Sequence, residues 1–229
     1  MDAELPAVRP AATVILWRAG AAGEEVLMGQ RGASAAFMPS KFVFPGGAVD
    51  PADYAVDLAT PLPAPTARRL GLDAPAGPPP AALAAAAIRE LWEEAGLALA
   101  TPGLWPSPPP DEGQDWAAFA AKGLRPAAGA MRFVFRAITP PGRTRRFDAR
   151  FFLVPAAAIT GDVNDFSAAS DELAHLHWVP LAEARKLDLP FITEVVLSEV
   201  GALLRGHGPD GGVPFFDNST ATPAFRRLV

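Results

Sequence analysis

The segment from Ala81 to Ala98 most constrains how this chain folds, because its composition predicts a long helix between two breaks. Alanine, leucine and glutamate dominate the segment, and all three are strong helix formers. Prolines crowd into residues 61–80 and 102–110 on either side of it. Because proline lacks the backbone N–H that helices and sheets need, these stretches predict surface loops. Gly96 is a suitable C-terminal cap near the end of the helix.

One side of this predicted helix is acidic. At about 100° of rotation per residue, Glu90, Glu93 and Glu94 fall on the same side. The opposite side is apolar and can pack on a sheet; it carries Ile88, Leu91, Trp92 and Ala95. Each like-charged pair at these spacings costs a helix about 0.2–0.5 kcal/mol, and Arg89, which pairs with Glu93, offsets only part of that cost. A solvated helix surface would explain such a cluster, but a hard divalent cation such as Mg²⁺ would also neutralise it.

Several apolar, β-branched runs elsewhere predict strands. We expect two hairpins and one further short strand, at residues 12–18 with 25–30, 131–138 with 149–154, and 175–179. Apolar residues at helical spacing predict a late helix from Phe191 to Leu204. This order of elements favours an α/β (α+β) fold in which helices cover a mixed sheet. A length of 229 residues fits one domain with insertions better than two domains.

The amino-acid composition excludes several kinds of chemical site and binding partner. The absence of cysteine excludes disulfides, thiolate nucleophiles and zinc–cysteine sites, so a metal would be held by oxygen or by the three histidines. A net charge of −5 argues against general binding to nucleic acid or an anionic membrane. The longest strongly apolar stretch, Ala81–Ile88, is too short to span a bilayer. The first residues show no basic segment followed by an apolar run, so we expect a cytoplasmic protein.

A glycine-containing turn precedes the acidic helix in the chain. Phe44-Pro45-Gly46-Gly47 follows a strand-like Phe42-Val43, and paired glycines let the backbone turn sharply and approach a ligand closely. Together with the run from Arg89 to Leu97, this turn resembles the signature of the Nudix hydrolases. In that signature a glycine and a glutamate are followed by Arg-Glu-aliphatic-x-Glu-Glu-x-Gly-aliphatic. Gly47 and every defined position of the second half match.

Two features depart from the family pattern. Asp53 stands where the family has its first glutamate, and it is shorter by one methylene. Arg89 lies much further from Gly47 than in the signature, which implies an insertion of 28 residues. We therefore expect a single Nudix domain over residues 1–229, with a Pro/Ala-rich insertion at about 54–82 inside the motif. A C-terminal extension would begin at about residue 205.

The resemblance implies a Nudix-type α/β/α sandwich, with a mixed β-sheet between helices, and an enzyme. The implied reaction is metal-dependent hydrolysis of the diphosphate linkage in a small-molecule nucleoside diphosphate derivative. Mg²⁺, with Mn²⁺ as the alternative ion, would be held by Glu90 and Glu94, with Glu93 as a further ligand or as the general base. Arg89 would hold the glutamates in place, and Gly47 would let a backbone carbonyl reach the metal.

The expected substrate depends on a resemblance to one branch of the family. Phe37-Met38-Pro39 and the run from Arg145 to Phe152 look like the branch that contains the peroxisomal acyl-CoA diphosphatases and their bacterial relatives. CoA or acyl-CoA would be cleaved to 3′-phospho-AMP and (acyl-)phosphopantetheine. A CoA site needs several cations, and the candidates are Arg31, Lys41, Arg143, Arg145, Arg146 and Arg150. A solvated hairpin tip explains the last four equally well.

Other functions stay open at this point. ADP-ribose or NADH would be cleaved by the same machinery, and a catalytically silent Nudix domain would bind a nucleotide as a sensor. The general base could be Glu93 or a residue outside the motif, Asp171 or Glu172. The insertion could cover the site or support a homodimer.

Overall fold

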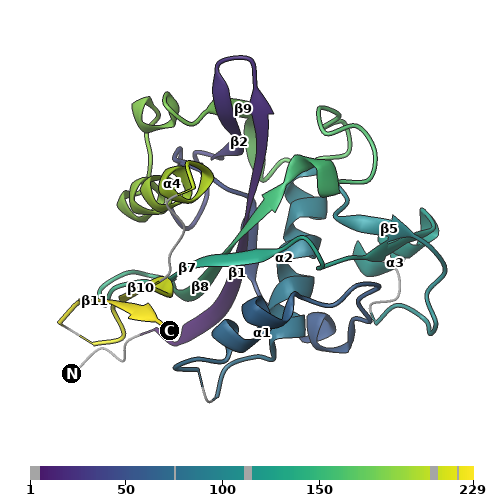
Figure 1. Cartoon of the computed structure of the whole chain (residues 1–229), viewed down its shortest axis with the longest axis horizontal. Coiled ribbons are helices and arrows are strands. Elements are labelled where there is room, and N and C mark those ends of the chain that lie inside the picture. Colours follow the sequence, from purple (N-terminus) through teal and green to yellow (C-terminus); the bar gives the residue numbers. More distant parts are fainter. Residues whose placement is uncertain (1–5, 75, 111–114, 207–210, 221) are drawn as a thin grey trace.

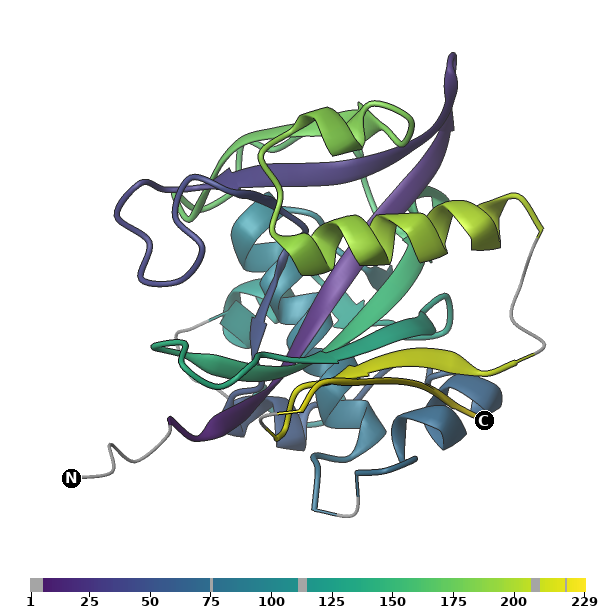
Figure 2. The same cartoon turned by 90° about the vertical axis from the view of Figure 1, so that its left-hand side faces the viewer.

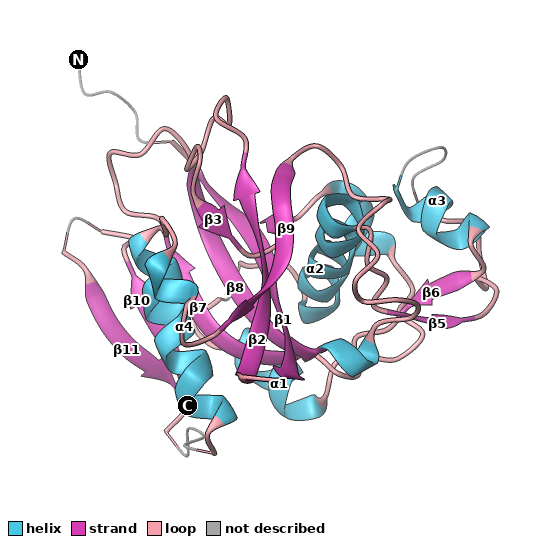
Figure 3. Cartoon of the chain, turned by 90° about the horizontal axis from the view of Figure 1, so that it is seen from above, coloured by secondary structure: helices cyan, strands magenta, loops and turns pink. Residues whose placement is uncertain are grey.

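The protein is described by a computed structural model over residues 6–74, 76–110, 115–206, 211–220 and 222–229. A mixed sheet forms its centre, with helix α2 (Pro80–Ala95) on one face and helix α4 (Phe191–Leu204) on the other (Figure 1). Seen from above, α4 lies on the left, the strands lie in the middle and α2 lies on the right (Figure 3). The expected α/β/α arrangement around a mixed sheet is therefore confirmed.

Nine strands within the described ranges make up the sheet, in the order β11-β10-β7-β8-β1-β2-β3, with β4 added to β1 and β9 to β2. Strand β1 (Val8–Gly20) lies at the centre, parallel to β8 (Arg146–Pro155) and antiparallel to β2 (Gly23–Arg31). Strand β4 (Gly46–Ala48) pairs with the first half of β1, and β2 pairs with the second half. The other strands of the sheet are β3 (Phe42–Val43), β7 (Arg132–Ile138), β9 (Leu173–Pro180), β10 (Val213–Asp217) and β11 (Ala224–Leu228). The glycine turn thus lies where β1 changes its pairing partner.

Alternation along β1 supplies both halves of the core. Val14 and Leu16 pack toward α2, whereas Ile15 between them packs toward α4, and all three are fully buried. Figure 2 shows the result, with α4 in front of β1 and α2 behind it. The strands predicted at 12–18, 25–30, 131–138, 149–154 and 175–179 are confirmed, as is the helix from Phe191 to Leu204.

Helix α2 is shorter and more enclosed than its sequence predicts. It ends at Ala95 rather than at Ala98, because Gly96 adopts a left-handed φ of 70° and donates its N–H to the carbonyl of Trp92. The acidic side was expected to face a cleft or solvent, yet Glu90 and Glu94 are buried together with the apolar side. A buried charge is unfavourable unless it is paired or hydrogen-bonded, so the residues around α2 must supply partners for these carboxylates.

The proline-rich stretch 61–80 is not the plain loop predicted from its composition. It contains helix α1 (Ala64–Leu70), whose Pro65 stands in the first turn, where a missing N–H costs nothing. Thr66 and Leu70 turn inward, and the Thr66 hydroxyl donates to the carbonyl of Met131. Arg136 on β7 donates to the carbonyls of Leu72 and Asp73 just beyond the helix. The insertion is therefore folded against the sheet.

Several other elements had no clear sequence signal. A two-stranded sheet, β5 (Ala100–Pro102) with β6 (Leu124–Pro126), flanks helix α3 (Asp115–Ala121). The C-terminal extension adds the hairpin of β10 and β11 to the main sheet, with β10 parallel to β7. Short 3-10 turns lie at η1 (Pro51–Ala55), η2 (Ala156–Ala158) and η3 (Ala184–Lys186). Of the helices in the described ranges, none is long and apolar enough to cross a membrane.

Candidate active site

The glycine turn and the acidic side of α2 meet directly. The backbone N–H of Gly46 donates to Glu94 Oε2 at 2.7 Å. A side chain on Gly47 would place its Cβ 2.5 Å from Glu90 Cδ, so only glycine lets the Glu90 carboxylate lie against this strand. Two residues that are adjacent in β4 are thereby joined to two carboxylates that lie one turn apart on α2.

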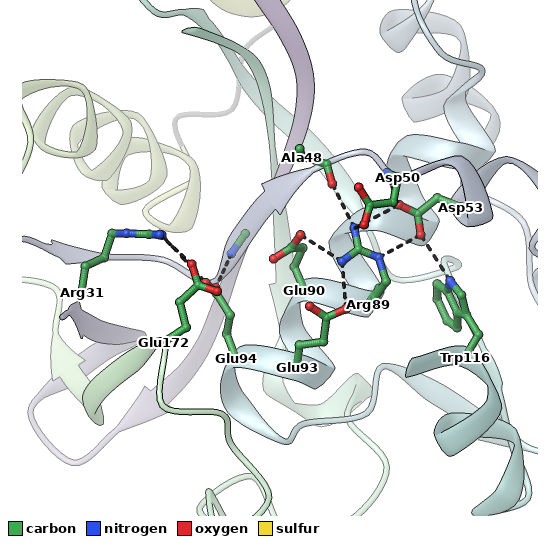
Figure 4. Close-up of polar contacts among 11 residues, drawn as sticks. Arg31, Ala48, Asp50, Asp53, Arg89, Glu90, Glu93, Glu94, Trp116 and Glu172 are labelled. Carbon is green, nitrogen blue, oxygen red and sulfur yellow. Dashed lines mark hydrogen bonds and ion pairs between the residues drawn. The ribbon is translucent and has the colours of Figure 1, made fainter. Parts of the chain in front are cut away.

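Arg89 connects the carboxylates to one another. Its Nη1 donates to Glu90 Oε1 at 3.0 Å and to Glu93 Oε1 at 2.8 Å, and its Nη2 donates to the carbonyl of Ala48 at 2.9 Å (Figure 4). The arginine side chain is only 5% exposed. A planar guanidinium with five N–H donors can hold several acceptors at once, which a lysine cannot.

The other edge of Arg89 is held by Asp53. The Asp53 carboxylate, fully buried, accepts from Nε and Nη2 of Arg89, each at 3.1 Å. Trp116 Nε1, from α3, donates to the same carboxylate at 3.2 Å, and the backbone N–H of Asp50 donates to it at 2.9 Å. Figure 4 shows Trp116 and Asp53 together on the side of Arg89 away from Glu90. The aspartate thus positions Arg89 rather than facing the glutamates.

Burial dominates the electrostatics of the three glutamates. It raises the pKa of Glu90 to about 7, although the neighbouring Arg89 opposes the shift. It raises the pKa of Glu93 to about 8, with Asp115 on α3 adding to the increase. Burial and the charge of Glu90 raise the pKa of Glu94 well above its ordinary value. Burial thus disfavours the charged form of all three carboxylates, and Arg89 only partly opposes this for Glu90 and Glu93.

A second arginine approaches the cluster from β2. Arg31 Nη2 forms an ion pair with Glu172 Oε1 at 2.6 Å, and its Nη1 lies 3.9 Å from Glu94 Oε1. Glu172 lies close enough for its charge to raise the pKa of both Glu90 and Glu94. Within the described part of the chain, Glu94 Oε1 and Arg31 Nε are buried without a hydrogen-bond partner. Arg31 and Glu172, both candidates from the sequence, therefore lie at the site, whereas Asp171 forms no ion pair or side-chain hydrogen bond with these residues in the described ranges.

Other predicted substrate-binding cations lie elsewhere. Lys41 forms an exposed ion pair with Asp188. Arg146 is buried and donates to the carbonyls of Thr139 and Asn218, and Arg150 is buried and paired with Asp148. Internal partners thus engage Arg146 and Arg150 inside the fold. Arg145 remains exposed at the start of β8.

The donor set of this site fits a hard divalent cation. Carboxylate oxygens are the ligands Mg²⁺ prefers, and the unpartnered Glu94 Oε1 and the raised pKa values indicate uncompensated acceptors. Across the described ranges, no three Asp, Glu or His side chains are already grouped as a ready metal site. Nη1 of Arg89 contacts one oxygen each of Glu90 and Glu93.

Comparisons with known proteins find similar sequences and folds. A Nudix hydrolase from Alicyclobacillus acidocaldarius superposes with a TM-score of 0.63 at 29% identity, over 84% of this chain and 90% of that chain. The chain thus has the fold of a Nudix hydrolase and is similar to these enzymes in sequence. Gly47 and the positions from Arg89 to Leu97, which resemble the Nudix motif, lie on either side of the segment that contains α1.

A second match is to a curated protein whose substrate is named. The acyl-coenzyme A diphosphatase NUDT19 of Gallus gallus is 37% identical over 136 residues, covering 45% of this chain and 35% of that protein. The match thus spans about a third of the curated relative's length. The MutT protein from Methanosarcina mazei Go1, at 16% identity and a TM-score of 0.50 over 89% of this chain and 99% of that chain, shares the fold. No family model matches the chain.

Sequence reasoning missed the contribution of α3 to this Nudix site. Trp116 reaches Asp53 across a separation of 63 residues, and Phe119 packs edge-on against Trp92 of α2 with ring centroids 5.3 Å apart. Trp116 is fully buried. Only a signal that pairs Trp116 with Asp53 could have revealed the additional hydrogen bond.

Proposed function

We propose that this protein is a divalent-cation-dependent diphosphatase that cleaves CoA or acyl-CoA to 3′-phospho-AMP and (acyl-)phosphopantetheine. The observation that carries the proposal is the convergence of two buried glutamates, Glu90 and Glu94, on the Gly46-Gly47 turn, with Arg89 joining the partly exposed Glu93 to Glu90. The likeness to an acyl-coenzyme A diphosphatase favours CoA over other diphosphates.

Glu90 and Glu94 would hold the cation, with Glu93 able to join them. A bound Mg²⁺ supplies Lewis acidity to the diphosphate and lowers the pKa of a bound water. Gly46 orients Glu94 through its N–H, and Gly47 leaves space for the Glu90 carboxylate. In the reaction, the oxygen of water forms a bond to one phosphorus while the bridging P–O bond breaks and the second phosphate leaves.

Glu93 is our choice for the general base. Its side chain is 26% exposed, whereas that of Glu94 is 1% exposed, so a water molecule can reach it. Its raised pKa, about 8 before any cation binds, lies near the pH at which a base is most effective. Glu172 is less suited, because its carboxylate is already engaged in an ion pair with Arg31.

A substrate panel tests the proposal. Purified protein is incubated with CoA, acetyl-CoA, ADP-ribose and NADH, with and without Mg²⁺, and products are identified by mass spectrometry. We expect Mg²⁺-dependent release of phosphopantetheine and 3′-phospho-AMP from CoA, and loss of most of this turnover in Glu94→Gln. Efficient cleavage of ADP-ribose or NADH with no product from CoA would overturn the substrate assignment.

Two further variants separate the roles. Glu93→Gln should lower kcat far more than Glu172→Gln, with both variants folded by circular dichroism. The reverse order would transfer the role of base to Glu172. If the wild-type protein binds nucleotides but Glu94→Gln changes neither turnover nor binding, the domain is a sensor and not an enzyme.

A further inference from the structure

The two oxygens of the Glu94 carboxylate have different surroundings. Oε2 accepts a hydrogen bond from the backbone N–H of Gly46 at 2.7 Å. Oε1 is buried and has no hydrogen-bond partner in the part of the chain that the structure describes, and the side chain is 1% exposed. A buried acceptor without a partner is unfavourable, so Oε1 favours the approach of a cationic group within reach.

Arg31 carries the cationic group that lies beside this oxygen. Its Nη1 is 3.9 Å from Glu94 Oε1, which is too far for a hydrogen bond. Such a bond needs about 3 Å, so a shift of about 1 Å by the flexible arginine side chain would close the gap. Arg31 would then occupy the oxygen that the proposed function assigns to the cation. Glu94 Oε1 therefore stays free only while Arg31 is held elsewhere.

Glu172 holds the Arg31 guanidinium in its present place. Nη2 of Arg31 donates to Glu172 Oε1 at 2.6 Å, and Figure 4 shows the guanidinium directed at the Glu172 carboxylate, with Glu94 beside it. Within the described ranges, this is the one hydrogen bond that the Arg31 side chain makes. The Arg31 side chain is 18% exposed. Removal of Glu172 would leave a largely buried guanidinium, which needs a new partner, next to the carboxylate of Glu94.

The backbone fixes Glu172 relative to both competing groups. Leu173, the next residue, stands opposite Arg31 in the pairing of β9 with β2. Ser170, two residues before Glu172, donates its backbone N–H to the carbonyl of Glu93 on α2 at 2.9 Å. Glu172 is thus tied on one side to the strand that carries Arg31 and on the other side to the helix that carries Glu94.

We propose that Glu172 is a positioning residue that holds Arg31 away from Glu94 and so keeps Glu94 Oε1 free for the cation, an inference that rests on the proposed function. The two carboxylates compete for one guanidinium, and the more exposed of them binds it. Glu172 acts through Arg31 and touches neither the cation nor the reacting atoms. A general base or a direct cation ligand at this position would act without Arg31, so the dependence on Arg31 distinguishes the three roles.

A double-mutant cycle measures this dependence. The affinity for Mn²⁺ is determined by isothermal titration calorimetry for the wild type, Glu172→Ala, Arg31→Ala and the double variant. Two controls complete the set. Glu172→Gln retains a carbonyl oxygen that can accept from Arg31, and Glu183→Ala removes an exposed glutamate that pairs with Lys186 instead.

We expect Glu172→Ala to raise the Kd for Mn²⁺ about tenfold, which corresponds to about 1.4 kcal/mol, because Arg31 then has to be displaced from Glu94. The two controls should change the Kd by no more than about twofold, as ordinary surface substitutions do. In the Arg31→Ala background no guanidinium competes, so loss of Glu172 should change the Kd by no more than about threefold, the effect of one nearby charge. An unchanged Kd in Glu172→Ala would overturn the inference. A tenfold loss in both backgrounds would also overturn it, because Glu172 would then bind the cation itself.

Turnover provides a readout that a purely structural role would not change in this way. In Glu172→Ala, the Mg²⁺ concentration for half-maximal rate should rise about tenfold, in proportion to the weaker binding, while kcat at saturating Mg²⁺ stays near the wild-type value. A fall in kcat that saturating Mg²⁺ does not restore would give Glu172 a role in the chemical step and overturn the inference.

A crystal structure of metal-free Glu172→Ala keeps the inference separate from the proposed function. We expect a guanidinium nitrogen of Arg31 to lie about 3 Å from Glu94 Oε1, as in a hydrogen bond. If Arg31 makes this contact but the wild type neither binds Mn²⁺ nor cleaves CoA, the proposed function is refuted and the holding role of Glu172 stands. If Arg31 stays in place without Glu172, the inference is refuted whatever the protein hydrolyses.

Discussion

Replacement of Asp53 by asparagine tests whether the buried ion pair with Arg89 shapes the acidic site. The aspartate accepts hydrogen bonds from Nε and Nη2 of Arg89, from Trp116 Nε1 and from the backbone N–H of Asp50. Asparagine has nearly the same volume, so packing is preserved. Its amide group, however, carries one acceptor oxygen and one NH₂ donor, where the carboxylate carries two acceptors.

The size of the effect follows from these contacts. One of the two oxygens of Asp53 becomes an NH₂ group, which faces N–H donors and cannot accept from them. Two of the four hydrogen bonds are lost, and one of these involves the Arg89 guanidinium, for which a bond contributes about 1.5–3 kcal/mol. Arg89 retains Glu90 and Glu93, so it does not become a lone buried charge. We therefore expect Asp53→Asn to lower the free energy of unfolding by about 3 kcal/mol, at the lower end of the about 3–5 kcal/mol that breaking a buried ion pair costs.

Urea-induced unfolding at pH 7, followed by tryptophan fluorescence, measures this change. Trp116→Phe is the matched control, since it removes a single neutral donor to Asp53 and should cost about 1 kcal/mol. Turnover should also fall in Asp53→Asn, because Arg89 would no longer be held in register with Glu90 and Glu93. A loss of less than 0.5 kcal/mol, roughly the effect of an ordinary surface substitution, would refute the view that Asp53 organises the site.

Three further predictions concern the glutamates. Burial raises the pKa of Glu90 from 4.5 to about 7 and the pKa of Glu93 from 4.5 to about 8. At pH values between about 4.5 and about 8, the folded metal-free protein therefore binds more protons than the unfolded chain. Its stability should therefore fall as the pH rises from about 4.5 to about 8, and urea midpoints that rise over this range would contradict the assignment. Added Mg²⁺ should raise the thermal unfolding temperature of the wild type at pH 8 more than at pH 6, and should have little effect on Glu94→Gln; equal shifts in both proteins would place the cation elsewhere. Gly47→Ala should displace the Glu90 carboxylate and lower kcat about 100-fold, whereas unchanged turnover would show that the close approach is dispensable.

Much of the fold could be predicted from local patterns. Alternating apolar residues located the strands of both main hairpins, and helical spacing located the helix from Phe191 to Leu204. The helix in the insertion was missed because composition suggested a loop: Pro63 and Pro65 are helix breakers in general, yet they occupy the start of α1, where proline is tolerated. Strands β10 and β11 depend on pairing with β7 and with each other, which no local pattern announces.

Some features of the candidate site could likewise be predicted from local sequence, whereas others could not. The spacing of Glu90, Glu93 and Glu94 on one helix, the capping role of Gly96 and the demand for glycine in the turn are properties of neighbouring residues, so the sequence by itself determined them. Tertiary structure decided which distant groups complete the site: Arg31, Glu172 and Trp116 reach it from other elements, and their contacts span 141 residues for Arg31 with Glu172 and 63 for Trp116 with Asp53.

Burial was likewise decided by the tertiary structure. The helical pattern divides α2 into an acidic and an apolar side, but it does not reveal that β4 and η1 cover the acidic side as well. It also does not distinguish Arg146, whose guanidinium the fold engages, from Arg145, which it leaves exposed one residue away. Whether a charge is solvated or compensated depends on the atoms that surround it, and long-range packing brings those atoms together.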